Sequence, residues 1–153
     1  MKVSEIMANI VEVVGWEESL TTVAQIMRDH DIGCVTVGSG DKLDGILTDR
    51  DIVCKGLAIG APLDCMTAAD VMTPDPVTCR PDDTLNQAAY IMEEHEVRRL
   101  PVLDDDDRLA GIVSLGDISR HGRRELAGRL IKKLSVPAHR ELTAGPSRVK
   151  AEA

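Results

Sequence analysis

The chain has 153 residues, a net charge of −8, one Trp, one Tyr and no Phe. This length allows one domain with a real core or two small units that share one, and two aromatic residues are too few for a surface that stacks single-stranded nucleic acid. No apolar run approaches the roughly 18 residues of a membrane span, and the first residues lack the apolar core of a signal peptide.

The predicted elements come in two copies, because the sequence aligns with itself at a shift of 65 residues. Glu5-Ile6-Met7 falls on Asp70-Val71-Met72. One extra residue in an acidic turn of the second copy changes the shift to 66, after which Asp51 falls on Asp117. The register holds over about 50 residues, so the sequence predicts a tandem duplication.

Each copy predicts a strand, a helix, a hairpin of two strands and a second helix. Ser19 opens the first helix of one copy, and Thr84 with Gln87 forms a capping box at the other. The second helices start near Asp49 and Leu115. The predicted strands cover residues 10–14, 34–37, 45–48, 77–79, 100–103 and 109–114, and polar turns at 38–42 and 104–108 close the hairpins.

These elements predict an α+β fold of two tandem β-α-β-β-α repeats. A unit of roughly 50–55 residues buries too little surface alone, so we expect the repeats to pack sheet to sheet with pseudo-twofold symmetry. The predicted division is repeat 1 at 1–57, a connector at 58–68, repeat 2 at 69–122, and a basic helix with a disordered tail at 123–153.

The repeats and their motifs resemble the cystathionine-beta-synthase (CBS) domain, here as a tandem pair, or Bateman module. The resemblance covers about residues 1–122. It is carried by Asp70-Val71-Met72-Thr73-Pro74, by His95-Glu96-Val97-Arg98-Arg99-Leu100-Pro101-Val102, and by the Gly-h-h-Ser/Thr-x-x-Asp-h element at 45–52 and 111–118, where h is apolar. The resemblance implies an adenine-nucleotide site between the repeats.

The chemistry of the repeated element fits such a ligand. Thr48 and Ser114 stand at strand-to-helix junctions, where unpaired backbone N–H groups and the helix dipole favour a phosphate. Asp51 and Asp117 follow one helical turn later and are placed to accept ribose hydroxyls. The alternative is that these four side chains only cap their helices.

The two copies differ in the basic residues near their motifs. Arg98 and Arg99 precede a strand of the second copy, where family members often contact ligand phosphate, whereas the first copy carries Arg50 inside its motif. The arginines could instead be solvated or pair with the acids at 93–96. We expect a better site at Ser114, Asp117, Arg98 and Arg99, and a weaker one at Thr48, Asp51 and Arg50. The resemblance adds Val11 and Val77 as apolar contacts to a purine.

No catalytic or metal-binding motif is visible, so we expect neither an enzyme nor a metal site. Walker, His-Glu-x-x-His, nucleophile-elbow and Gly-x-Gly-x-x-Gly patterns are absent. The four cysteines lack zinc-ribbon or Cys-x-x-Cys spacing, and we expect reduced thiols in a cytoplasmic protein.

The charge of the last residues differs from that of the body. Residues 1–118 carry 9 basic and 23 acidic side chains, whereas residues 119–153 carry 9 basic and 3 acidic ones. The acidic body disfavours nucleic acid. The stripe formed by Leu126, Leu130, Ile131 and Leu134 predicts a helix that packs on the body or on a second subunit; docking to an acidic partner, nucleic acid or a membrane surface is the alternative. Beyond Pro137 we expect disorder.

The sequence and the resemblance together predict a non-enzymatic sensor that binds AMP, ADP or ATP, forms a homodimer and signals to an effector protein. S-adenosylmethionine or a dinucleotide would use the same ribose and adenine contacts. The alternative function is a dimeric interaction adaptor with a vestigial pocket, acting through its basic C-terminal segment.

Overall fold

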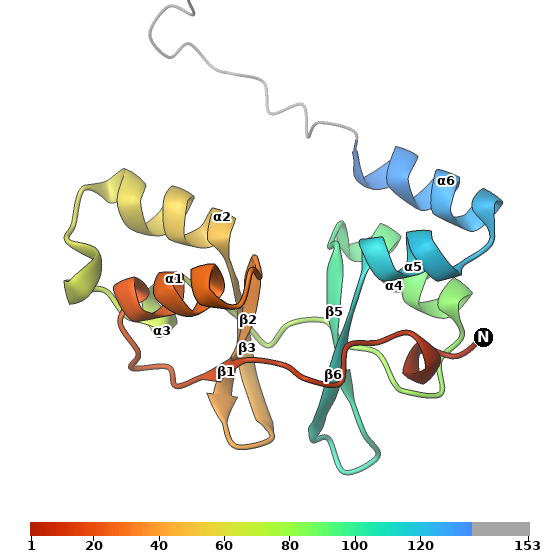
Figure 1. Ribbon diagram of the computed structural model, residues 1–153, viewed down its shortest axis with the longest axis horizontal. Helices are drawn as coiled ribbons and strands as arrows, with labels where there is room; N and C mark the ends of the chain where they lie inside the picture. The colour runs from red at the N-terminus through yellow and green to blue at the C-terminus, as the bar shows by residue number, and fades with distance from the viewer. Residues whose placement is uncertain (136–153) are drawn as a thin grey trace, which may run out of the picture.

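The computed structural model describes residues 1–135, which form two similar halves side by side (Figure 1). The expected disorder beyond Pro137 lies outside these residues. Paired strands stand in the middle of the molecule, and their hairpin tips lie together at one end. A backbone hydrogen bond joins the two tips, from the Leu109 N–H to the Asp41 carbonyl at 2.7 Å. This arrangement confirms the predicted α+β class and the packing of two repeats.

The first half contains the five predicted elements. They are β1 (Val13–Val14), α1 (Leu20–Asp29), β2 (Cys34–Ser39), β3 (Lys42–Thr48) and α2 (Asp49–Asp51), which continues through the helical turns η2 (Ile52–Gly56) and η3 (Leu57–Ile59). The Ser19 hydroxyl caps α1 by accepting the Thr22 N–H at 3.1 Å. The hairpin turn is shorter than predicted, because a bulge after Val37 lets the strands pair as far as Ser39.

The second half repeats this order with one reduction. It contains α4 (Leu85–His95), β5 (Arg99–Leu103), β6 (Leu109–Ser114) and α5 (Leu115–His121), and it adds α6 (Arg124–Leu134). A single bridge between Cys79 and Val102 replaces the first strand. The capping box of Thr84 and Gln87 is confirmed.

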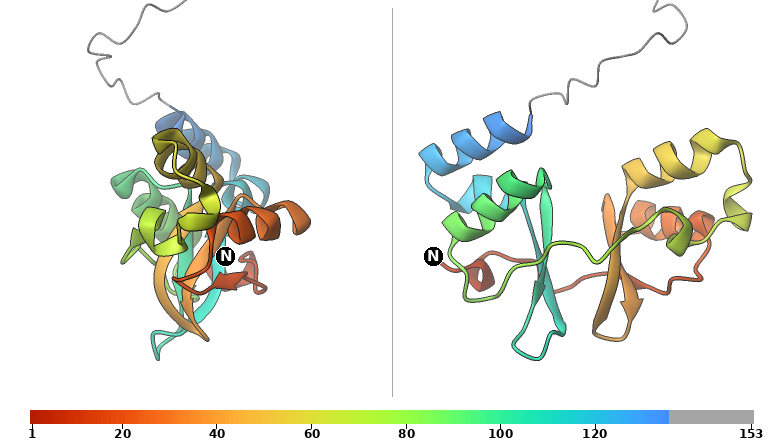
Figure 2. Two further views of the ribbon diagram at one scale, coloured as in Figure 1. Left: turned by 90° about the vertical axis from the view of Figure 1, so that its left-hand side faces the viewer. Right: turned by 180° about the vertical axis from the view of Figure 1, so that it is seen from behind.

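Each half is completed by a segment that belongs to the other repeat in sequence. The turn η1 (Val3–Glu5) packs in the core of the second half, and Ala8 pairs with Ile112 of β6. In return, the segment after η4 (Leu63–Cys65) places α3 (Ala68–Val71) in the core of the first half and pairs β4 (Thr73–Pro74) with β3. Figures 1 and 2 show the two crossings, in red and in green.

The exchange gives two separate cores. One gathers α1, β2 and β3 with α3 around Leu20, Val35 and Leu47; the other gathers α4, β5 and α5 with η1 and α6 around Met92, Leu100 and Ile118. The first sheet has the order β1-β2-β3-β4, and only the β1–β2 pair is parallel.

The predicted C-terminal helix lies on the second half as α6. Ala127, Leu130 and Leu134 are buried, whereas Ile131, predicted on the same apolar stripe, is 44% exposed. The buried face of α6 covers α4 and α5 (Figure 1). Within residues 1–135, none of the helices has the length and apolar character needed to cross a membrane.

Candidate functional site

The two Ser/Thr-x-x-Asp turns occupy equivalent places, where β3 runs into α2 and β6 into α5. In the first turn, Oδ2 of Asp51 accepts the Thr48 backbone N–H at 2.9 Å and the Thr48 hydroxyl at 2.8 Å. In the second, Oδ2 of Asp117 accepts the corresponding Ser114 groups at 2.8 and 2.6 Å. Each turn is thus a closed capping box, as the capping alternative expects.

The second oxygen of each carboxylate is paired as well. Oδ1 of Asp51 lies 2.8 Å from Nζ of Lys55, and Oδ1 of Asp117 lies 2.5 Å from Nη2 of Arg120. The two aspartate side chains are only 16% and 17% exposed. An ionised carboxylate has about four lone-pair sites, so each can still accept a bond from a ligand hydroxyl.

The electrostatics of the first turn keep its carboxylate ionised. Burial alone would raise the pKa of Asp51, but the hydrogen bonds from Lys55 and Thr48 and the Lys55 charge outweigh it, so this pKa lies below its usual value. A ligand that binds here therefore meets an anion whose partner cation is already in place.

The second half reaches across to this turn through Arg99. Its backbone pairs with Ser114 in the β5–β6 register, yet its Nη2 lies only 3.6 Å from where a Cβ on Gly33 would be. A Cβ at Gly33 would also lie 2.8 Å from Oδ2 of Asp49. The absence of a side chain at Gly33 therefore leaves space for the Arg99 guanidinium and the Asp49 carboxylate. Burial raises the pKa of the neighbouring Cys34 thiol to about 11, and the Arg99 charge partly offsets this rise.

The remaining predicted residues are more dispersed. Arg98 points away from Arg99 and donates from Nη2 to the Leu134 carbonyl at the end of α6. Arg50 is exposed on α2. Val11 and Val77 are half-buried in the two segments that cross between the halves.

The sequence analysis missed three residues that shape these turns. Lys55 and Arg120 stand four and three positions after their aspartates, and this spacing on a helix is itself a signal for an ion pair. Gly33 gave no local signal, because the side chain it makes room for comes from the other repeat.

The motif is not specific by itself. Thr67 and Asp70, at the start of α3, form the same closed box, with Oδ2 accepting the Thr67 N–H at 2.7 Å and its hydroxyl at 3.0 Å. What distinguishes the turns at Thr48 and Ser114 is their place at the ends of the paired central strands, with Arg99 between them.

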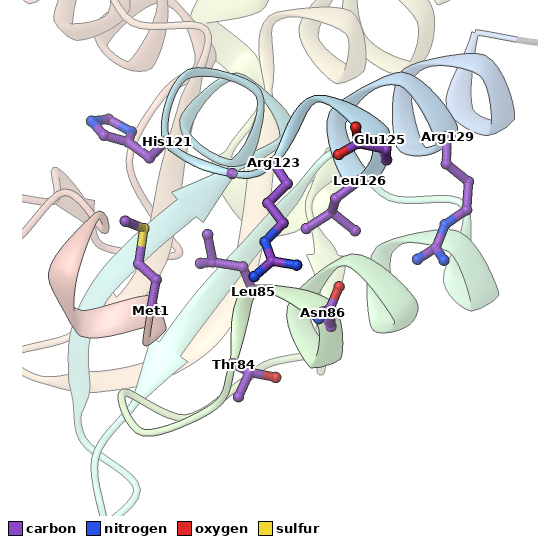
Figure 3. A pocket seen from close by; sticks show the side chains of 10 residues that line it. Met1, Thr84, Leu85, Asn86, His121, Arg123, Glu125, Leu126 and Arg129 are labelled. Carbon is purple, nitrogen blue, oxygen red and sulfur yellow. The ribbon is translucent and has the colours of Figure 1, made fainter.

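A cavity of about 790 Å³ lies elsewhere, between α4, α6 and the first residue of the chain (Figure 3). Leu85 and Leu126 supply its apolar walls, and the Arg123 side chain extends from the start of α6 toward the first turn of α4. Arg129 also lines it but is paired with Glu93 at 2.9 Å. The cavity therefore marks where α6 and α4 pack loosely.

The part of the chain that the structure covers gathers no metal-ligating cluster. Among residues 1–135, no three His, Cys, Asp or Glu side chains come together in a way that could hold a metal ion. His30 lies near a single carboxylate, with its Nδ1 at 3.3 Å from Oε1 of Glu12.

Comparison with known proteins identifies the repeats. The family model of the CBS domain matches residues 3–55 and 68–124. Hypoxic response protein 1 of Mycobacterium tuberculosis is 40% identical over 134 residues, which is 87% of this chain and 93% of that protein. A crystal structure of Hypoxic Response Protein I with two coordinated zinc ions aligns with a TM-score of 0.72 and 42% identity, covering 80% of this chain and all of that one.

A second solved structure bears on ligands. The CBS domain pair of protein MJ0100, in complex with 5′-methylthioadenosine and S-adenosyl-L-methionine, aligns with a TM-score of 0.70 and 30% identity. The alignment covers 78% of this chain and 94% of that one. Both ligands of that protein contain adenosine.

Proposed function

Because this chain belongs to the CBS domain family, we propose that it is a regulatory module without catalytic activity, which binds an adenosine-containing ligand in the cleft between its repeats. The proposed ligands are AMP, ADP and ATP. Binding would favour one relative placement of the two halves, and an effector protein would read the change. A cytoplasmic location fits the four free thiols.

The observation that carries this proposal is that Arg99 lies beside both repeats, next to the two equivalent turns. Each turn offers a hydroxyl and a carboxylate, the groups that phosphate and ribose require. Arg99 lies beside Ser114 through its backbone and beside Gly33 through its guanidinium. A ligand that touches Arg99 would thus contact both repeats.

The choice of a phosphate-bearing ligand rests on Arg99. The structure of MJ0100 supports adenosine as the shared chemistry, but methylthioadenosine carries no phosphate. The Arg99 guanidinium shares the space beside Gly33 with the Asp49 carboxylate. It favours an anionic group, because charge-assisted bonds to phosphate are about twice as strong as neutral ones.

The test is thermal unfolding of the full chain with AMP, ADP, ATP, S-adenosylmethionine and 5′-methylthioadenosine. A ligand at 100 times its Kd stabilises the protein by about 2.7 kcal/mol, a shift of several degrees at this size. Asp117→Asn and Arg99→Gln should each weaken binding at least tenfold, about 1.4 kcal/mol.

The matched control is Asp70→Asn, which alters the same kind of capping box outside the cleft. It should change the melting temperature of the free protein while leaving the ligand-induced shift intact. A shift that is equally reduced in Asp70→Asn and Asp117→Asn would contradict the site assignment.

The second candidate function is a dimeric adaptor with an empty pocket. It is favoured by the closed state of both turns, whose carboxylates already hold Lys55 and Arg120. Exposed apolar side chains on the helices, including Leu57 at 59% and Tyr90 at 60% exposure, suit the homodimer that both proposals include. No thermal shift with any of the five ligands at millimolar concentration would favour the adaptor.

A further inference from the structure

Two neighbouring arginines, one just before β5 and one at its first residue, extend in different directions. The Arg99 guanidinium lies beside Gly33 of the first half, whereas Arg98 precedes β5 and is exposed. Nη2 of Arg98 donates to the carbonyl of Leu134 at 2.9 Å. Arg98 therefore holds the last residue of α6.

The backbone of Arg98 is tied to the proposed ligand site. Its carbonyl accepts the N–H of Leu115 at 2.8 Å, and Leu115 directly follows Ser114. One residue thus contacts the second Ser/Thr-x-x-Asp turn through its backbone and the end of α6 through its side chain.

The two ends of α6 have different surroundings. At its start α6 borders the cavity that Arg123 enters, and Ala127 is buried against the body (Figure 3). The later part is held by the buried Leu130 and Leu134 and by the Arg98 guanidinium. A cation at this position also complements the negative end of the helix dipole.

We propose that Arg98 is an autoinhibitory latch between α6 and the nucleotide site, an inference that rests on the proposed function. While Arg98 bonds Leu134, its guanidinium is withheld from the proposed ligand. A ligand phosphate beside Ser114 draws the guanidinium away, because a phosphate is charged and can accept two parallel N–H bonds, whereas the Leu134 carbonyl is neutral. The last turn of α6 then loses its cap and loosens.

In the ligand-bound state, the loosened α6 presents a changed surface to an effector protein. Arg124, Lys132 and Lys133 of α6 form no ion pair with residues 1–135. Loosening of α6 changes how these cations are presented and exposes the apolar face they flank. Because coupling between two equilibria is reciprocal, whatever undocks α6 also favours phosphate binding.

The test is hydrogen exchange of the full chain, read by mass spectrometry, with AMP and with 5′-methylthioadenosine as probes. Both should protect the amides of the turn that starts at Ser114. Only AMP, which carries the phosphate, should speed exchange at residues 131–135, by threefold or more. In Arg98→Gln these amides should exchange fast without ligand, and AMP should add nothing.

Arg80→Gln is the matched control, since Arg80 also donates to backbone carbonyls, those of Leu103 and Asp104, at the hairpin tip. It should leave the AMP effect on α6 unchanged. Leu134→Ala, which weakens docking while keeping Arg98, should tighten AMP binding several-fold.

The outcomes separate the latch from the function it rests on. Protection of the turn by AMP without faster exchange in α6, or unchanged AMP affinity in Leu134→Ala, overturns the latch and leaves the sensor standing. If neither probe protects the turn, the proposed function fails and the latch fails with it.

Discussion

The exchange of segments between the halves predicts a large cost for adding one methyl group at Gly111. A Cβ there would lie 2.7 Å from the carbonyl oxygen of Ala8, well short of the 3.4 Å at which ordinary contact begins. Ala8 cannot withdraw freely, because its N–H and its carbonyl both bond Ile112, at 2.9 and 3.0 Å. In Gly111→Ala, the new methyl group fits only if these two hydrogen bonds are strained or broken.

The magnitude follows from these contacts. Overpacking costs about 1–3 kcal/mol, and each strained hydrogen bond up to about 1 kcal/mol, so we expect Gly111→Ala to lower the free energy of unfolding by about 2–3 kcal/mol. At the equivalent Gly45, the nearest atom is the flexible Met72 sulfur at 2.6 Å, and the nearest backbone atom, the Thr73 carbonyl oxygen, lies at 3.0 Å rather than 2.7 Å. Gly45→Ala should therefore cost less, about 1 kcal/mol, the low end of the range for overpacking.

The assay is urea unfolding followed by circular dichroism, with Gly128→Ala as the control. A Cβ on Gly128, in α6, meets no heavy atom within 4 Å, so alanine should stabilise the helix by up to about 1 kcal/mol. A Gly111→Ala variant that is as stable as the natural protein, or less destabilised than Gly45→Ala, would show that the segment 1–8 does not restrain β6.

Two further predictions concern titratable groups. The pKa of Asp51 is lowered on folding, so its contribution to stability is fully present above its unfolded value of 3.8 and is lost as the pH falls through the folded value; the difference in unfolding free energy between the natural protein and Asp51→Asn should shrink below that pH. Burial raises the pKa of Cys34 to about 11 and of Cys79 to about 12, so iodoacetamide at mildly alkaline pH should label the exposed Cys54 and Cys65 first, as peptide mapping would show.

Local signals predicted the main helices and both hairpins, but not the short helix α3. Ser19 and Thr84 cap their helices as their sequence context indicates, and the strand at 109–114 is the observed β6. Equivalence between 5–7 and 70–72 was also visible in the sequence. Which half each segment packs on was not visible, because both cores accept an apolar turn of this kind. Gly45 and Gly111 were the only sequence signal of this exchange, since a glycine inside a strand often marks the close approach of another backbone.

The site was harder to predict than the fold. The sequence placed Arg98 and Arg99 in one predicted site, and no local pattern showed that the Arg98 side chain turns toward α6 while the Arg99 side chain turns toward the first half. The partner of Arg98 lies 36 residues later, at the end of a helix whose docking no local pattern fixes. That Arg99 binds phosphate stays a prediction.

In the proposed function, the differences between the repeats let one ligand site depend on both halves. At the positions where the second repeat has Arg98 and Arg99, the first has Gly33 and Cys34. An arginine at position 33 would put a second cation beside the Arg99 guanidinium, and like charges would repel each other. With glycine at one position, a single guanidinium enters the space beside Gly33. A phosphate bound by Arg99 would contact a cation of the second repeat while lying beside the first. Its affinity would therefore depend on how the two repeats are placed, which is the property that a conformational sensor requires.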